Sequence, residues 1–171
     1  MLAFALLVYA AAMVVANLTV AAFGPVVTPI NAFLLIGLDL ALRDWLQLRL
    51  KVWQMGLLII GTGVVSLLLN PAADKIALAS SLSFLAAALV DWGFFVRLKG
   101  SWLRRSMGSN VAGAAVDSFV FPLIAFGAFL PQVVAMQFVA KVAGGALWSW
   151  GLSRHFNARH VTSGAQIGLV D

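Results

Sequence analysis

Six apolar runs, each close to the length that crosses a lipid bilayer, follow one another along almost the whole sequence. They cover residues 2–22, 26–42, 52–69, 76–96, 108–129 and 133–152. A helix needs about 20 apolar residues to span the hydrocarbon core, where the backbone finds no water and must bond within the helix. The sequence therefore predicts an all-α, polytopic membrane protein with six transmembrane helices, forming a single domain over residues 1–171.

Composition excludes a soluble domain, because 63% of the residues are hydrophobic and only 10% are charged. A soluble core of this size would need a polar shell that so few charges cannot form. The chain has no Cys, which excludes disulfides and thiolate metal sites. It also lacks a phosphate-binding loop and a Ser/His/Asp arrangement, so we expect no enzymatic activity, no cofactor and no metal. Energy from ATP would require another polypeptide.

Basic residues indicate how the helices are oriented, since short cytoplasmic loops are enriched in Lys and Arg. Of the 11 basic residues, Lys75 lies in a loop of the opposite side and Lys141 lies inside the last helix; the other nine fall on one side. These nine are Arg43, Arg49, Lys51, Arg97, Lys99, Arg104, Arg105, Arg154 and Arg159. We therefore predict a multi-pass protein of the inner, cytoplasmic membrane with both termini in the cytoplasm, and no nucleic-acid partner. The tail 155–171 is expected to be loosely ordered.

Ionisable residues inside a bilayer are costly, so they are the natural candidates for function. Asp39 and Arg43 stand four apart on one helix face and are predicted to form an ion pair, with either a structural or a gating role. Asp91 precedes Trp92 and Phe95, and a carboxylate beside aromatic surface suits a planar ligand that donates hydrogen bonds. The alternative is that Arg97 simply neutralises Asp91.

The last two helices carry the most specific polar pattern. Asn110 and Asp117 are seven apart on one face, and Gln137 and Lys141 are four apart on the next helix. A carboxylate accepts two adjacent N–H groups, as the edge of a guanine-like ring presents them. Lys141 needs a counter-charge, for which Asp117 and Asp91 are the candidates, and a purely neutralising role stays open. Asn17 and Asn31 have either a ligand or a helix-linking role.

These residues occur in an order that resembles the vitamin uptake transporter family, also called queuosine precursor transporters. The resemblance rests on Asn17, Asp39-Leu40-Ala41-Leu42-Arg43, Val90-Asp91-Trp92 with Phe95 and Arg97, Gly108-Ser109-Asn110-Val111, Val116-Asp117-Ser118, Phe121-Pro122-Leu123 and Phe138-Val139-Ala140-Lys141-Val142. It implies a fold like the six-helix substrate-binding subunits of energy-coupling-factor transporters. It also implies import of a 7-deazaguanine, chiefly 7-cyano-7-deazaguanine, without a dedicated ATPase subunit.

The predicted partners are a small heterocyclic substrate and the lipid bilayer, with a homo-oligomer left open. The predicted substrate site contains Asn17, Asp39, Asp91, Asn110, Asp117, Gln137 and Lys141, with Trp92, Phe95 and Phe121 as stacking surfaces. The alternative function is a binding subunit for another vitamin-like molecule, which transports only when docked on a separate energising module. A third class, a structural or pore-forming membrane protein with no ligand, would have to retain intramembrane charges that cost roughly 2.5–3.5 kcal/mol each when unpaired.

The predicted orientation is testable with topology reporters. Fusions placed after Leu69 and after Asp171 should report opposite sides of the membrane, because an odd number of helices separates these points. Identical sides for the two fusions would contradict the six-helix arrangement.

Overall fold

The computed structural model describes residues 1–156, and in this range the fold is entirely helical, as predicted. Of the predicted tail 155–171, residues 155 and 156 belong to the last helix. The rest of the tail lies outside the described residues. The elements are α1 (Leu2–Phe23), η1 (Gly24–Val27), α2 (Thr28–Asn31), η2 (Ala32–Ile36), α3 (Gly37–Gln47), α4 (Val52–Leu69), η3 (Pro71–Ala73), α5 (Asp74–Arg97), α6 (Trp102–Phe126) and α7 (Pro131–Phe156).

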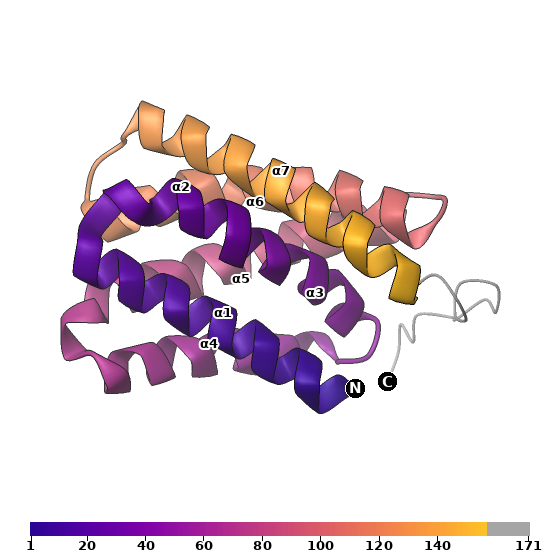
Figure 1. Ribbon diagram of the computed structural model, residues 1–171, viewed down its shortest axis with the longest axis horizontal. Coiled ribbons are helices and arrows are strands. Elements are labelled where there is room, and N and C mark those ends of the chain that lie inside the picture. The colour runs from indigo at the N-terminus through magenta and orange to yellow at the C-terminus, as the bar shows by residue number, and fades with distance from the viewer. Residues whose placement is uncertain (157–171) are drawn as a thin grey trace.

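Five segments are long and apolar enough to cross a membrane, where the sequence predicts six. The difference lies in the first segment, Leu2–Gln47, whose 46 residues are helical almost without interruption. A straight helix of that length would measure about 69 Å, roughly twice the hydrocarbon thickness. The chain instead reverses at Gly24, whose φ of 71° suits glycine, and at Pro25. The segment from α2 to α3 then runs back beside α1 (Figure 1).

Three predicted helices have boundaries that move by several residues, and the last of them, predicted at 133–152, covers Pro131–Phe156. The predicted helix 26–42 continues to Gln47 and contains a π-helical turn at Ala32–Ile36. The predicted helix 108–129 instead covers Trp102–Phe126. It starts early because the Ser101 hydroxyl caps it, accepting a hydrogen bond from the Arg104 backbone at 3.4 Å. Gly127, with φ 67°, ends it.

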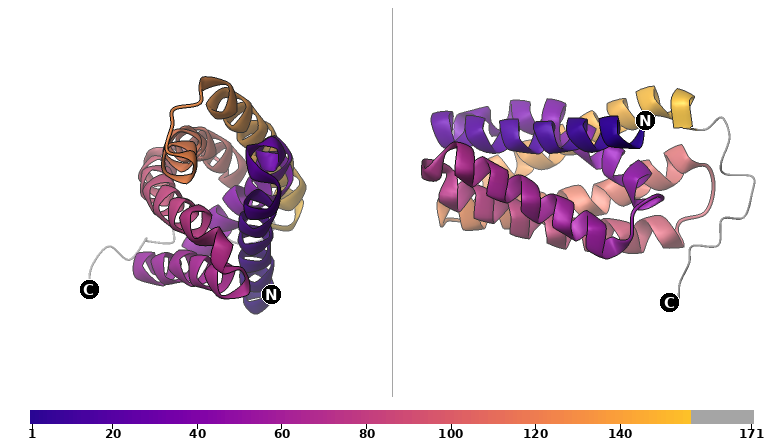
Figure 2. Two further views of the ribbon diagram at one scale, coloured as in Figure 1. Left: turned by 90° about the vertical axis from the view of Figure 1, so that its left-hand side faces the viewer. Right: turned by 90° about the horizontal axis from the view of Figure 1, so that it is seen from below.

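The helices form one elongated bundle. α4 lies at one edge, packed against α1 and α5, and α7 lies at the other, packed against α6, α3 and η2 (Figures 1 and 2). The N-terminus and the end of α7 lie at the same end of the bundle (Figure 1). The loops that follow α3 and α5, which carry the basic residues Arg49, Lys51 and Lys99, lie at that end too. We refer to it as the basic end.

Tryptophan residues differ in their exposure. Trp53 and Trp150 are exposed, as interfacial anchors would be, but Trp45 and Trp102 are buried. Trp148 donates its indole N–H to the carbonyl of Leu34 at 3.0 Å. Since Leu34 lies in the π-helical turn, this bond ties that turn to α7.

α7 and the π-helical turn are in backbone contact. A Cβ at Gly144 would overlap the carbonyl group of Phe33, and a Cβ at Gly37 would lie 2.6 Å from the carbonyl carbon of Gly144. Only glycine allows this approach, which resembles the small-residue crossings of other membrane helices. The crossing fixes the position of α7 relative to η2.

Gly144→Ala should destabilise the protein by about 1–3 kcal/mol, because the new methyl group would force the two backbones apart. Unfolding of the purified protein in detergent measures the change. The matched control is Gly151→Ala on the same helix, where a Cβ meets nothing within 4 Å and a neutral or stabilising effect is expected. Equal stability of Gly144→Ala and wild type would show that the close crossing does not form.

Candidate functional site: a polar cavity between five segments

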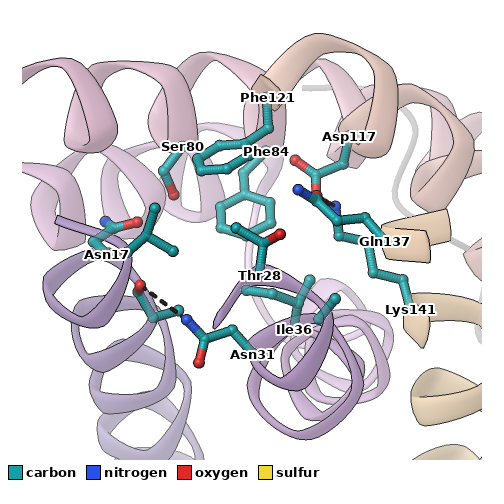
Figure 3. A pocket seen from close by; sticks show the side chains of 13 residues that line it. Asn17, Thr28, Asn31, Ile36, Ser80, Phe84, Asp117, Phe121, Gln137 and Lys141 are labelled. Atoms are coloured by element: carbon teal, nitrogen blue, oxygen red, sulfur yellow. Dashed lines mark hydrogen bonds and ion pairs between the residues drawn. The ribbon is translucent and has the colours of Figure 1, made fainter. Parts of the chain in front are cut away.

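A polar cavity lies in the half of the bundle away from the basic end, because its lining residues lie toward the end of α1, the end of α6 and the start of α5. Figure 1 shows the turns after α1 and α6 and before α5 at the end opposite the basic end. Its walls come from α1, from α2 with η2, and from α5, α6 and α7, as Figure 3 shows. The lining residues are Ala16, Asn17, Val20, Thr28, Asn31, Ala32, Ile36, Ser80, Phe84, Asp117, Phe121, Gln137 and Lys141. Segments far apart in the sequence therefore build one site.

Lys141, Asp117 and Gln137 form the charged side of the cavity. The Nζ of Lys141 lies 2.7 Å from Oδ2 of Asp117 and donates to Oε1 of Gln137 at 2.8 Å. All three residues are 2% exposed. Asp117 Oδ1 and Gln137 Nε2 are buried without a hydrogen-bond partner among the described residues. The trio thus presents one unused acceptor and one unused donor beside the cavity.

The opposite wall is held by hydrogen bonds between helices. Asn17 donates to the Ser66 hydroxyl at 3.0 Å, which links α1 to α4. Asn31 donates to the Thr19 hydroxyl at 2.7 Å and to the Ala16 carbonyl at 3.3 Å, the latter drawn in Figure 3. Both asparagines therefore link helices, and both line the cavity. Their role toward a ligand stays a prediction.

The cavity is small and partly open. Its volume is about 30 Å³, and one water needs about 10–15 Å³ by the same measure. A bicyclic ligand would require its walls to move apart.

A second buried polar cluster lies toward the basic end. The Nε of Arg43 lies 3.7 Å from Oδ2 of Asp91, with both side chains fully buried. The Ser106 hydroxyl donates to Oδ2 of Asp44. The Ser106 and Ser149 hydroxyls lie 3.0 Å apart, which brings α3, α5, α6 and α7 together.

Five of the predicted substrate residues meet at the cavity: Asn17, Asp117, Phe121, Gln137 and Lys141. The other five do not line it. Asp39 and Asp91 belong to the region around Arg43, and Asn110 donates to the hydroxyls of Ser106 and Ser149 at 3.3 and 3.4 Å. Phe95 packs under the Arg105 guanidinium, whose Cζ lies 4.1 Å from the ring centroid. Trp92 is half-buried, away from the cavity.

The predicted ion pair of Asp39 with Arg43 needs correction, because Arg43 pairs with Asp91 instead. Gly113 on α6 leaves the space for this contact, because a Cβ there would lie 3.0 Å from an Nη of Arg43 and 3.1 Å from the Cβ of Asp91. Arg97 does not neutralise Asp91; its guanidinium donates to the Gly93 carbonyl at 2.9 Å.

Sequence reasoning missed Ser80 and Phe84 in the cavity, and Asp44 in the second cluster. Asp44 was placed in a loop because the predicted helix ended at residue 42, whereas α3 continues to Gln47. The sequence does contain a signal for Asp44. If the helix is continued past residue 42, Asp39 and Arg43 share a face and Asp44 lies next to that face. Among the described residues no group of acidic or histidine side chains has an arrangement that could hold a metal ion.

The helices and the cavity are those of a polytopic membrane protein with buried polar side chains around an internal space. A family described as "Putative vitamin uptake transporter" matches residues 1–152. The chain therefore belongs to this family, which makes it a membrane transporter and not an enzyme. No curated protein and no solved structure matches the chain.

Asp117 and Lys141 should be energetically coupled, because each would be an unpaired charge in the bundle without the other. Asp117→Asn and Lys141→Met should each destabilise the protein by about 3 kcal/mol, and the double variant by clearly less than the sum of the two. Unfolding in detergent measures all three. The exposed neighbours Asp74 and Lys75 provide the control pair, for which additivity is expected. Additivity for Asp117 and Lys141 would contradict the pairing.

Proposed function

We propose that this protein imports 7-cyano-7-deazaguanine, or a closely related 7-deazaguanine, into the cytoplasm. The observation that carries the proposal is the trio of Asp117, Gln137 and Lys141, with its unused acceptor and donor beside a small cavity. A transporter site for a polar heterocycle must replace the hydrogen bonds that the ligand loses when it leaves water. The family match supports transport, and the chemistry of the trio supports the class of substrate.

The amide edge of a guanine-type ring places an N–H next to a carbonyl oxygen. Asp117 Oδ1 accepts from the ring N–H and the exocyclic amine, and Gln137 Nε2 donates to the carbonyl oxygen. Phe84 and Phe121 supply apolar surface for the ring faces (Figure 3). An adenine-type edge carries the reverse pattern at these positions and would leave the buried carboxylate unpaired, so it should be rejected.

The proposal includes six membrane crossings in the inner membrane, with both termini in the cytoplasm. The reversal at Gly24 divides the first segment into two antiparallel halves, which supports six crossings. The basic residues at one end of the bundle support the orientation. The cavity then lies in the half that faces away from the cytoplasm, where an imported substrate arrives. The six-helix subunits of energy-coupling-factor transporters are the proposed structural counterpart.

Transport then proceeds by alternating access, in which the cavity opens in turn to the outside and to the cytoplasm. Pro122 breaks the hydrogen-bond ladder of α6 directly beside Phe121. This break allows the end of α6 to bend away from α1 and α2, which would enlarge the cavity. No ATPase is needed for the movement itself, since binding energy shifts the equilibrium between the openings.

The test is rescue of queuosine in transfer RNA, in cells that lack both precursor synthesis and their own importer, at limiting external 7-cyano-7-deazaguanine. Wild-type protein should restore the modification. Asp117→Asn should lower the initial uptake rate about tenfold or more, because a hydrogen bond to a charged group contributes about 1.5–3 kcal/mol.

The control is Asp74→Asn, which changes an exposed carboxyl that does not line the cavity and should transport like wild type. Each protein must be shown in the membrane by immunodetection. If wild type restores nothing, the substrate is wrong; if Asp117→Asn equals wild type, the site is wrong.

A further inference from the structure

The buried cluster around Arg43 carries more negative than positive charge. Asp39, Asp44 and Asp91 surround a single guanidinium, and each of the four side chains is 0% exposed. With every carboxyl group ionised, the cluster would have a net charge of −2. Placing unpaired ions in the interior costs several kcal/mol each, so this state is strongly unfavourable inside a bundle that contacts lipid.

Arg43 can neutralise only one of the three carboxylates. Its closest ion-pair contact is Asp91, at 3.7 Å from Nε to Oδ2. Asp39 and Asp44 are therefore the surplus acids. Asp44 accepts from the Ser106 hydroxyl and has Asp91 as a neighbour, while Tyr9 lies next to Asp39.

The hydrogen bonding of the cluster is incomplete. Neither carboxyl oxygen of Asp39 has a hydrogen-bond partner in the described part of the chain, and the same holds for the three guanidinium nitrogens of Arg43. Oδ1 of Asp44 and both oxygens of Asp91 are also buried and unbonded there. Buried acceptors without donors are costly. A proton on a surplus carboxyl group removes one negative charge and adds the missing donor.

A metal cation fits this cluster poorly. The Arg43 guanidinium stands among the acids, where it repels a cation and occupies the space that ligands would need. No metal-holding group is found among the described acidic and histidine residues. The proton is the one cation that binds to a single oxygen and needs no coordination shell.

The cluster connects to the cavity and to the basic end. Ile36 lines the cavity one turn before Asp39 on the same helical segment, and Asp117 acts electrostatically on Asp39 from α6. Lys141 balances Asp117, as the 2.7 Å contact shows. Toward the basic end, Arg105 acts on Asp44, and Ser106, Ser149 and Asn110 continue the polar contacts. Charged and hydroxyl groups thus extend from the cavity toward the cytoplasmic side.

We propose that Asp39 and Asp44 form a proton-binding site and that protons move through it together with the imported substrate. A proton adds to a carboxylate oxygen when the cavity faces outward and leaves from the same oxygen when it faces the cytoplasm. The proton-binding part stands on the cluster alone, and the coupling part rests on the proposed transport function.

The first experiment tests the proton site without any substrate. Infrared spectra of the purified protein in liposomes should show the C=O stretching band of a protonated, buried carboxyl group at neutral pH. The double variant Asp39→Asn with Asp44→Asn should lose this band, and the exposed control Asp74→Asn should keep it. The double variant leaves the neutral pair of Arg43 and Asp91, so it imitates the protonated state and should fold. Absence of the band in wild type, or its persistence in the double variant, would overturn the proposal.

The second experiment tests coupling in the same liposomes, with 7-cyano-7-deazaguanine as the probe. An acidic exterior should raise uptake by wild type about tenfold per unit of pH difference at equilibrium, since one proton moved per substrate adds about 1.4 kcal/mol. The double variant should exchange labelled for unlabelled substrate but ignore the pH difference. If uptake by wild type does not change with the pH difference, the proposed coupling of proton and substrate movement is wrong. If wild type takes up nothing at all, the proposed substrate is wrong, and the infrared band alone decides the proton site.

Discussion

An ionised lysine inside a helical bundle that contacts lipid must find its counter-charge within the bundle, and this requirement shapes the site. Lys141 and Asp117 lie on successive helices, 2.7 Å apart at Nζ and Oδ2. The pair holds α6 against α7, Gln137 accepts a hydrogen bond from Lys141, and all three side chains line the cavity. The unused oxygen of Asp117 and the unused amide of Gln137 follow from this arrangement, because Lys141 occupies only one side of each group.

Close helix packing allows the buried charges to meet. A Cβ at Gly113 would lie 3.0 Å from an Nη of Arg43 and 3.1 Å from the Cβ of Asp91, so glycine leaves the space in which those two side chains pair. Gly144 does the same for the backbone crossing of α7 with the π-helical turn. These glycines therefore allow the short distances between helices at which the buried charged side chains can meet. The two polar regions, one at each half of the bundle, depend on the same few close crossings.

Hydropathy alone predicts much of the fold, since a run of about 20 apolar residues in lipid has few alternatives to a helix. The Val52–Leu69 helix was predicted to the residue. Helix ends that contain polar residues were harder to predict. The start of α6 depends on capping by Ser101, and the continuation of α3 to Gln47 goes with tertiary contacts of Arg105 and Asp44. The face of a helix on which a polar residue lies was predicted well. Its position along the length of the bundle, and so the polar region to which it belongs, was not. Asn110 and Asp117 share a face, yet they belong to different polar regions.

The central claim is that the trio of Asp117, Gln137 and Lys141 recognises a guanine-type edge. Thermal unfolding of the purified protein with added ligand tests it most directly, because a ligand that binds only the folded state stabilises it, by about 2.7 kcal/mol at a hundredfold excess over Kd. The account predicts a rise in Tm with 7-cyano-7-deazaguanine, none with 7-deazaadenine, and none with either ligand for Gln137→Met. Equal stabilisation by both ligands, or a full response from Gln137→Met, would contradict it.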